Sequence, residues 1–240
     1  KFQGNQGLWV HGTLLIPEAT ASPNRWNTES RRTYFTSIHD DTVGGDTNGN
    51  GASTTPSMFD HLGVRFHPGS VGFLRLATLR YAGTEANCSW WCTTGPLQNL
   101  GGTVTLLGVH LTHGFRQGLY QAAGTTTIRF SELSNNLWFG IMAVGGALEV
   151  SNSIFSGHAW ADADLEYLSS FVNFGNRTEG GGKQGFLTYN IRADQDWYPG
   201  IPFLPQTEIP VGKTLTVHPG VILKPGGWLK VYGTFIAAGT

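Results

Sequence analysis

A repeat of 22 residues in the middle of the chain is the feature that most limits how it can fold. Segments 111–119, 133–141 and 155–163 align column by column, because 133 − 111 and 155 − 133 both equal 22. Each segment opens on an apolar residue and has further apolar residues four and eight positions later, as Leu137 and Ile141 are in the second. A period this short leaves no room for two helices and a loop. It predicts stacked coils that bury their apolar faces against one another.

Strand signals dominate the rest of the chain. Segments 32–38, 62–66 and 72–82 are rich in β-branched and aromatic residues, and helical periodicity never extends over eleven residues. Gly accounts for 34 of 240 residues, roughly double the usual ~7%, as frequent turns require. We therefore predict an all-β fold in which three short strands make up each 22-residue coil, with long loop insertions and a single domain over residues 1–240.

The two ends of the chain carry the same short motif. Gly12-Thr13 and Gly233-Thr234 lie 221 positions apart (233 − 12), close to ten steps of 22. Two interpretations remain open. Either the chain is a segment of a longer repeat-containing protein, or its ends are built for end-to-end stacking with equivalent repeats.

Several segments resemble a known superfamily. Residues 35–49 read Phe-Thr-Ser-x-x-Asp-Asp-x-x-Gly-Gly-Asp-Thr-Asn-Gly, residues 79–83 read Leu-Arg-Tyr-Ala-Gly, and residues 229–240 read Leu-x-Val-x-Gly-Thr-x-x-Ala-x-Gly-Thr. These patterns are similar to right-handed parallel β-helix repeats of secreted and cell-surface bacterial proteins in the pectin-lyase-like superfamily. The resemblance implies that fold and an extracellular location. It does not fix an activity, because the superfamily contains lyases, hydrolases, adhesins and inert stalks.

Charge and hydropathy argue against two classes of partner. The formal net charge is −1 and charged residues make up 13% of the chain, about half the usual ~25%. Without a basic patch, nucleic-acid binding is not expected. No apolar run approaches the roughly 18 residues that a membrane-spanning helix needs, so no membrane span is expected.

The two cysteines lie together in a tryptophan-rich insertion, residues 84–102. Cys88 and Cys92 are close enough to form a disulfide, which would indicate an oxidising compartment; a pair of free thiols is the alternative. Trp90 and Trp91 lie between them and are the best candidates for binding a polysaccharide or another cell-surface ligand. The competing interpretation is a hydrophobic plug laid over the side of a coil.

A glycine-rich acidic loop spans residues 39–52. Its side-chain oxygens come from Asp40, Asp41, Asp46, Asn48 and Asn50, listed in chain order. The last three alternate as in the first half of an EF-hand loop, which predicts a structural Ca²⁺ ion. The loop departs from that motif because Ser57, and not Glu, stands at the twelfth position. The alternative is an Asx-turn loop whose side chains bond its own backbone.

Three further carboxylates alternate at Asp162, Asp164 and Glu166, so in an extended segment they would share one face. Such a group is able to bind a cation or to act as acid and base on a sugar. The repeat has Gly118 and Gly140 in the column of Asp162. That favours a turn or a solvated edge over a catalytic cleft.

Two other repeat columns have simple structural interpretations. Trp138 and Trp160 share one column and predict a stacked ladder of rings. His113, Asn135 and Gly157 share another column, and a position that tolerates such different polar residues predicts a turn.

These features predict a non-catalytic extracellular module with a structural or adhesive role, which binds carbohydrate through loop aromatics. The alternative is a carbohydrate-active enzyme, a polysaccharide lyase or glycoside hydrolase, with Asp162, Asp164 and Glu166 as its catalytic residues. In either case we expect the regular coils to serve as a structural scaffold. Function is expected where the 22-residue step is broken, at residues 39–52 and 84–102.

Overall fold

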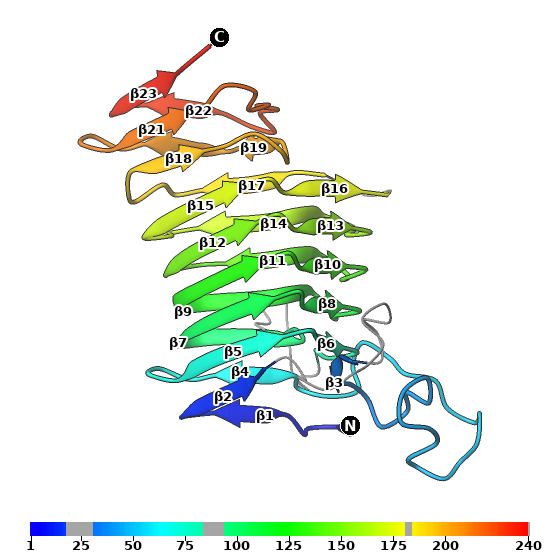
Figure 1. The fold of residues 1–240 in the computed structure, drawn as a ribbon. Coiled ribbons are helices and arrows are strands. Elements are labelled where there is room, and N and C mark those ends of the chain that lie inside the picture. The colour runs from blue at the N-terminus through cyan, green and yellow to red at the C-terminus, as the bar shows by residue number, and fades with distance from the viewer. Residues whose placement is uncertain (18–30, 84–93, 181–183, 240) are drawn as a thin grey trace.

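The chain folds into a stack of coils built from parallel strands, which rise from the N-terminal to the C-terminal end in Figure 1. This computed structural model describes residues 1–17, 31–83, 94–180 and 184–239. The described residues form 23 strands and no α-helix, which confirms the predicted all-β class. None of them forms a helix long and apolar enough to cross a membrane.

The largest sheet has twelve strands, and its pairings are parallel. Its main path is β1 (Leu8–Val10), β4 (Val64–Phe66), β7 (Leu97–Leu107), β9 (Gln117–Arg129), β11 (Phe139–Ala143), β14 (Ala161–Glu166), β17 (Phe186–Tyr189) and β19 (Phe203–Pro205). Beside it lie β2 (Thr13–Ile16), β5 (Val71–Arg75), β12 (Ala147–Ser151) and β15 (Ser170–Phe174), joined through the second halves of β7 and β9. Parallel neighbours require a crossover between them, so each step along the path closes one coil.

A second sheet of six strands supplies the third side of the central coils. It contains β3 (Thr33–Phe35), β6 (Ala77–Arg80), β8 (His110–Thr112), β10 (Glu132–Ser134), β13 (Ile154–Ser156) and β16 (Arg177–Glu179). Near the C-terminus, β18 (Gln195–Trp197), β21 (Thr214–Val217) and β23 (Thr234–Ala237) form a three-stranded sheet, and β20 (Thr207–Ile209) pairs with β22 (Leu229–Val231). A central coil thus has three strands, for example β11, β12 and β13, as the sequence predicts.

The strand register reproduces the 22-residue repeat. Leu111 pairs with Leu133, and Leu133 pairs with Phe155, so residues 22 positions apart lie side by side. Ile141, eight positions into its segment, is buried in the same stack. Leu137 differs from the pattern, because its side chain is 40% exposed. It lies two residues after the corner of the coil at Asn135, where the backbone is left-handed.

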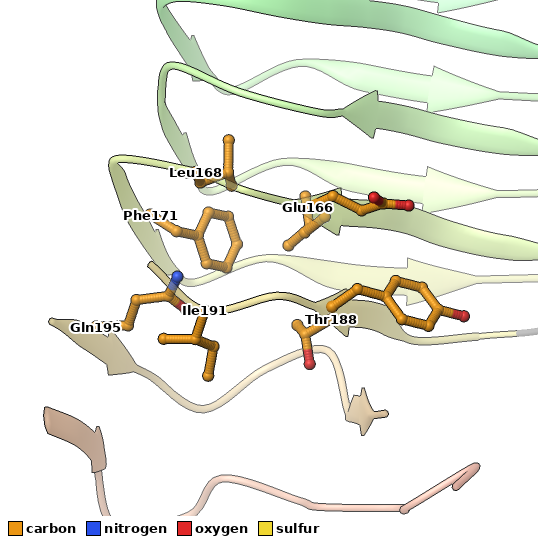
Figure 2. Close-up of a pocket in the computed structure, with 8 residues that line it drawn as sticks. Glu166, Leu168, Phe171, Thr188, Ile191 and Gln195 are labelled. Carbon is orange, nitrogen blue, oxygen red and sulfur yellow. The ribbon is translucent and has the colours of Figure 1, made fainter. Parts of the chain in front are cut away.

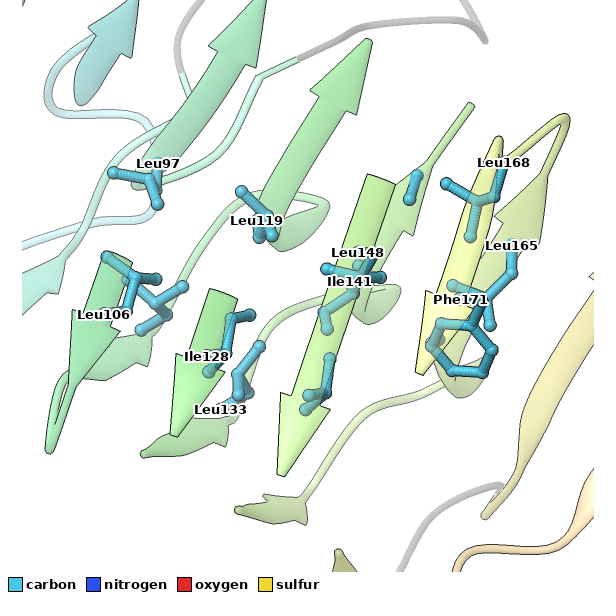
Figure 3. Packing of buried hydrophobic residues seen from close by; sticks show 14 of the residues in the cluster. Leu97, Leu106, Leu119, Ile128, Leu133, Ile141, Leu148, Leu165, Leu168 and Phe171 are labelled. Carbon is cyan, nitrogen blue, oxygen red and sulfur yellow. The ribbon is translucent and has the colours of Figure 1, made fainter. Parts of the chain in front are cut away.

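The core consists of columns of apolar side chains inside the coils, shown in Figure 3. Leu119 and Ile141 pair in register and are both buried, and burying such a side chain contributes about 1.5–3 kcal/mol. Toward the C-terminal end the columns become aromatic, and the ring of Trp197 stacks on that of Phe203 with centroids 4.2 Å apart. The core is therefore one continuous column that no single coil is able to form alone.

The corners of the coils need unusual backbone conformations. His113, Asn135 and Gly157 have φ angles of 51°, 52° and 66°. This left-handed region favours Gly and Asn. It recurs at the same point of three successive coils, so the predicted turn column is confirmed.

Buried polar side chains pair the backbone at a second corner. The N–H of Val109 donates to Ser131 Oγ and the N–H of Ser131 donates to Ser153 Oγ, each at 3.1 Å. The N–H of Ser153 in turn donates to Asn176 Oδ1 at 3.0 Å. Each coil thus satisfies a donor of the preceding coil that strand pairing leaves unpaired.

The step changes toward the C-terminus. Phe155 pairs with Thr178, 23 positions on (178 − 155), whereas Leu215 and Phe235 are 20 apart (235 − 215). The six-stranded sheet ends at β16 among the described residues, and the coil from Phe203 to Leu223 contains β19, β20 and β21, of which β20 pairs with β22 in a separate sheet.

Candidate functional site

The three carboxylates predicted to share a face lie on β14, and the structure brings only two of them together. Asp162 is 2% exposed, and its Oδ2 accepts a hydrogen bond from the N–H of Gly185 at 2.8 Å. Gly140 occupies the same position in the preceding coil. That position is also crowded, because a Cβ added to Gly140 would lie 2.8 Å from His158 Nε2. Burial raises the pKa of Asp162 to about 6, although the bond from Gly185 lowers it. Asp162 is thus an interior residue that ties β14 to the next coil.

Asp164 and Glu166 form the remaining pair, with Tyr189 beside them. Glu166 pairs in register with Tyr189 on β17. Burial, and then the charge of Glu166, raise the pKa of Asp164 to about 7. Burial also raises the pKa of Glu166, and burial and both carboxylates raise the pKa of Tyr189. A carboxyl that keeps its proton near neutral pH is able to act as a general acid.

Two details describe the surroundings of this pair. Asp164 Oδ1 is buried and accepts no hydrogen bond from a described residue. A cavity nearby is lined by Leu165, Glu166, Leu168, Phe171, Thr188, Tyr189, Ile191 and Gln195. In Figure 2 the carboxylate of Glu166 points away from Phe171 and Leu168. The cavity therefore has both apolar and polar walls, and Glu166 is the one residue of the acidic pair that lines it.

The acidic loop is tied to the coils by a charge pair. Asp40 is fully buried, and its Oδ2 accepts a hydrogen bond from Arg80 Nε at 2.8 Å. Thr36 and Thr42 also donate to its carboxylate. Burial by itself would raise the pKa of Asp40, but the bonds from Thr36 and Thr42 and the charge of Arg80 lower it overall. Asp40 therefore anchors the start of the loop to β6.

At the centre of the loop, the carboxylate of Asp46 caps backbone N–H groups four and five residues further along the chain. Asp46 accepts the backbone N–H of Asn50 at 3.2 Å and that of Gly51 at 2.7 Å. Asn50 Nδ2 donates to Thr54 Oγ1 at 2.9 Å, and Asn48 Nδ2 lies 3.1 Å from His39 Nδ1. The carboxylate of Asp46 thus holds its own backbone, as the alternative interpretation expects.

Some oxygen atoms of the loop have no protein partner. Asp41 Oδ1, Asn48 Oδ1 and Asn50 Oδ1 are buried and accept no hydrogen bond from a described residue. Hard oxygen atoms of this kind suit Ca²⁺, which takes 6–8 ligands. Three of the five predicted ligand residues therefore have an oxygen atom that no described protein group engages, while Asp40 and Asp46 accept hydrogen bonds from protein groups. The described residues contain no group of three or more His, Cys, Asp and Glu side chains placed to hold a metal.

A row of rings crosses several coils at another corner. Trp138 and Trp160 stack with centroids 4.8 Å apart and ring planes within 10°, which confirms the predicted ladder. The guanidinium of Arg116 lies 3.9 Å from the centroid of Trp138, on a third coil. Phe115 lies beside Arg116 and contacts Phe59, with ring centroids 4.2 Å apart. We call these five residues the aromatic row.

The aromatic row combines rigidity with exposure. Trp160 is 48% exposed, whereas Arg116 is buried and its guanidinium packs on the ring of Trp138. Arg116, Trp138 and Trp160 lie 22 positions apart (138 − 116 and 160 − 138), so each is held by the same point of a successive coil. That spacing was available in the sequence as a signal for Arg116, which the sequence prediction missed. The contact with Phe59 has no such signal, because it comes from a loop.

Four predicted residues lie outside the described part of the chain. They are Cys88, Trp90, Trp91 and Cys92, within residues 84–93. The predicted disulfide and the predicted binding role of the two tryptophans stay predictions.

Comparisons with known proteins return no match: no family model, curated protein or solved structure resembles this chain closely enough to be paired with it.

Proposed function

We propose that this chain is a non-catalytic extracellular module, a right-handed parallel β-helix over residues 1–240 that displays a carbohydrate-binding surface. The parallel pairing of the strands supports a right-handed winding of the coils, because crossovers between parallel strands of one sheet are right-handed in about 98% of cases. The resemblance of the sequence to pectin-lyase-like repeats supports the extracellular location. The role is structural and adhesive, since a stiff stack holds its surface side chains at fixed spacing.

The observation that carries this proposal is the aromatic row. Trp160 offers an exposed aromatic surface that is held in place by Trp138, and Trp138 is held by Arg116. Aromatic side chains provide a large apolar contact area with few rotatable bonds, so little entropy is lost on binding. The apolar C–H faces of sugar rings match such a surface.

The experiment is a pull-down on a panel of insoluble polysaccharides, followed by a binding isotherm on each material that retains the protein. Trp160→Ala is expected to weaken binding by at least tenfold, because aromatic hot-spot residues contribute about 2 kcal/mol or more. Phe174→Ala is the matched control. Phe174 is 45% exposed and lies on β15, away from the row. Its replacement is expected to leave binding unchanged.

The same assay separates the row from the tryptophans of the insertion. If Trp90→Ala or Trp91→Ala abolishes binding while Trp160→Ala does not, the binding surface belongs to the insertion. If neither the unsubstituted chain nor any variant binds a polysaccharide, the carbohydrate role is wrong.

A second candidate function is a carbohydrate-active enzyme, and one observation favours it. Burial and the charge of Glu166 raise the pKa of Asp164 to about 7. Near neutral pH, the carboxyl of Asp164 can therefore keep its proton while that of Glu166 is ionised. Acid–base cleavage of a glycosidic bond requires that combination. Asp162 has no role in this proposed enzyme mechanism, because its side chain is buried. Release of reducing ends or unsaturated sugars that is lost in Asp164→Asn would support the enzyme over the module.

The proposal also includes a structural Ca²⁺ ion in the loop at residues 39–52. Its support is the set of unpartnered oxygen atoms on Asp41, Asn48 and Asn50. The ion would fix the loop and take no part in chemistry.

A further inference from the structure

Trp138, in the middle of the aromatic row, has neighbours on both faces of its ring. The guanidinium of Arg116 lies 3.9 Å from the ring centroid, and the ring of Trp160 stacks at a centroid distance of 4.8 Å. These neighbours lie 22 positions before and after Trp138, so they belong to the preceding and the following coil. Trp138 is accordingly half-buried. Its faces are occupied, and only its edge is left for a ligand.

Trp160 differs from Trp138, because its ring contacts come from one side. Trp138 stacks on it, and the ring of Phe139 lies nearly perpendicular to it, at 86° and with centroids 5.9 Å apart. Both residues belong to the preceding coil. Among the described residues, no ring or guanidinium lies on the face toward the following coil. The Trp160 side chain is 48% exposed. It is therefore a flat platform with a fixed orientation and one open face.

The orientation of this platform limits the size of the ligand that stacks on it. The planes of Trp138 and Trp160 are 10° apart, so the row is a pile of flat groups that follows the stack of coils. A pyranose ring that places its C–H groups on the open indole face would be the next flat group of the pile. Equatorial glycosidic bonds leave a pyranose roughly in the plane of the sugar ring. The next sugar of a chain would therefore lie beside the pile, where it meets no second indole face of the row.

We propose that the aromatic row binds a single pyranose ring, stacked on the face of Trp160 that points toward the following coil. The inference rests on the proposed carbohydrate-binding function and specifies the ligand that the site recognises. That ligand is one sugar residue, either as a free glycoside or as one unit of a chain.

A site for several sugar rings would have a different arrangement. It needs several indole faces that point outward, and each additional well-stacked ring then increases the affinity by about tenfold. Among its described residues the row offers one such face. The affinity of the row should therefore not depend on the length of the sugar chain.

The test compares sugars of different length. The probes are the methyl β-glycopyranosides of glucose, mannose and xylose, each with the disaccharide and the tetrasaccharide of the same sugar. They are titrated into the unsubstituted chain and followed by nuclear magnetic resonance. Within a series that binds, we expect the three dissociation constants to agree within about twofold, in the millimolar range that one stacked ring provides.

The same titration locates the sugar on the protein. The indole N–H signal of Trp160, identified by its loss in Trp160→Phe, is expected to move more than that of any other tryptophan. Trp160→Ala should weaken binding of the methyl glycoside at least tenfold, by about the contribution of a hot-spot residue. Leu137→Ala is the matched control and should leave binding unchanged. Leu137 precedes Trp138 and is 40% exposed, so a chain laid along the row would contact it.

Failure of this inference differs from failure of the proposed function. A tenfold gain from methyl glycoside to tetrasaccharide would overturn the single-ring site and leave carbohydrate binding in place. The same holds if Leu137→Ala weakens binding as much as Trp160→Ala, if the signal of another tryptophan moves and that of Trp160 does not, or if a polysaccharide binds and no methyl glycoside does. Absence of binding by every polysaccharide and every probe would remove both. Circular dichroism checks that each variant keeps the stack of coils.

Discussion

The two acidic regions of the molecule bury their carboxylates in opposite ways. In the loop at residues 39–52, Asp40 is enclosed by two threonine hydroxyls and Arg80, and its pKa is lowered. On β14, Asp164 is half-buried next to another carboxylate, and no ion pair joins it to a described residue, so its pKa is raised. The difference shows that the number of acidic residues in a segment says little about its role. A paired carboxylate holds a fold together, whereas an unpaired one carries an electrostatic cost that is typical of functional sites.

The two regions should respond to pH with opposite signs. The folded pKa of Asp40 is below its usual value, so its contribution to stability is present above about pH 4 and is lost on acidification. The folded pKa of Asp164 is about 7, above its usual value. Its contribution is therefore complete below about pH 4 and is lost as the pH rises toward 7.

The largest expected effect comes from removing the partner of Asp40. Arg80→Met leaves a buried carboxylate without its cation, and we expect the free energy of unfolding to fall by about 3 kcal/mol at pH 7. Urea unfolding measures it. Arg177→Met is the matched control, because the pair of Arg177 with Glu179 is exposed on both sides and should contribute under about 1 kcal/mol. Equal losses in the two variants would show that Asp40 is no anchor.

A smaller effect of opposite sign is expected on β14. Asp164→Asn removes a carboxylate that is costly to ionise, so it should stabilise the fold by about 2 kcal/mol at pH 8 and leave it nearly unchanged at pH 4. Thermal melts at both pH values measure the change. Glu208→Gln, at an exposed position of β20, is the control. A variant that is destabilised at pH 8 would mean that the Asp164 carboxylate makes a favourable contact in its ionised form.

The sequence predicted the central coils well because their constraint is periodic. Leu111, Leu133 and Phe155 must face the same core, and that requirement repeats at a fixed step that is visible without a structure. The stacked pair of Trp138 and Trp160 follows from the same periodicity. The shorter C-terminal coils could not be predicted this way, because the six-stranded sheet ends at β16 among the described residues and the step changes beyond it.

The contacts that decide the sites were not visible in the sequence. Asp40 and Arg80 are 40 positions apart (80 − 40), and their meeting depends on how an irregular loop folds back on β6. Alternation predicted that Asp162 would face the same way as Asp164. The structure instead encloses Asp162, because β14 starts at a corner where the earlier coils have glycine. Periodicity therefore determines which residues share a column, while corners and insertions determine which of them reach the surface.

The smallest expected effect concerns the loop itself and sharpens the comparison between the two acidic regions. Asp41 Oδ1, Asn48 Oδ1 and Asn50 Oδ1 have no protein donor, unlike the oxygen atoms of Asp40. If Ca²⁺ supplies the missing positive charge, millimolar calcium should stabilise chelator-treated protein by about 1 kcal/mol, as expected for sites with dissociation constants of 10⁻⁴–10⁻³ M.

Calorimetric titration and melting with and without calcium measure this effect. Asp41→Asn should weaken it, and Asp164→Asn is the control that leaves it intact. Absence of both heat and a melting shift would remove the ion from the loop. Asp40 would then be the loop's main electrostatic anchor, and the difference between the two regions would rest on Arg80 and the hydroxyls of Thr36 and Thr42.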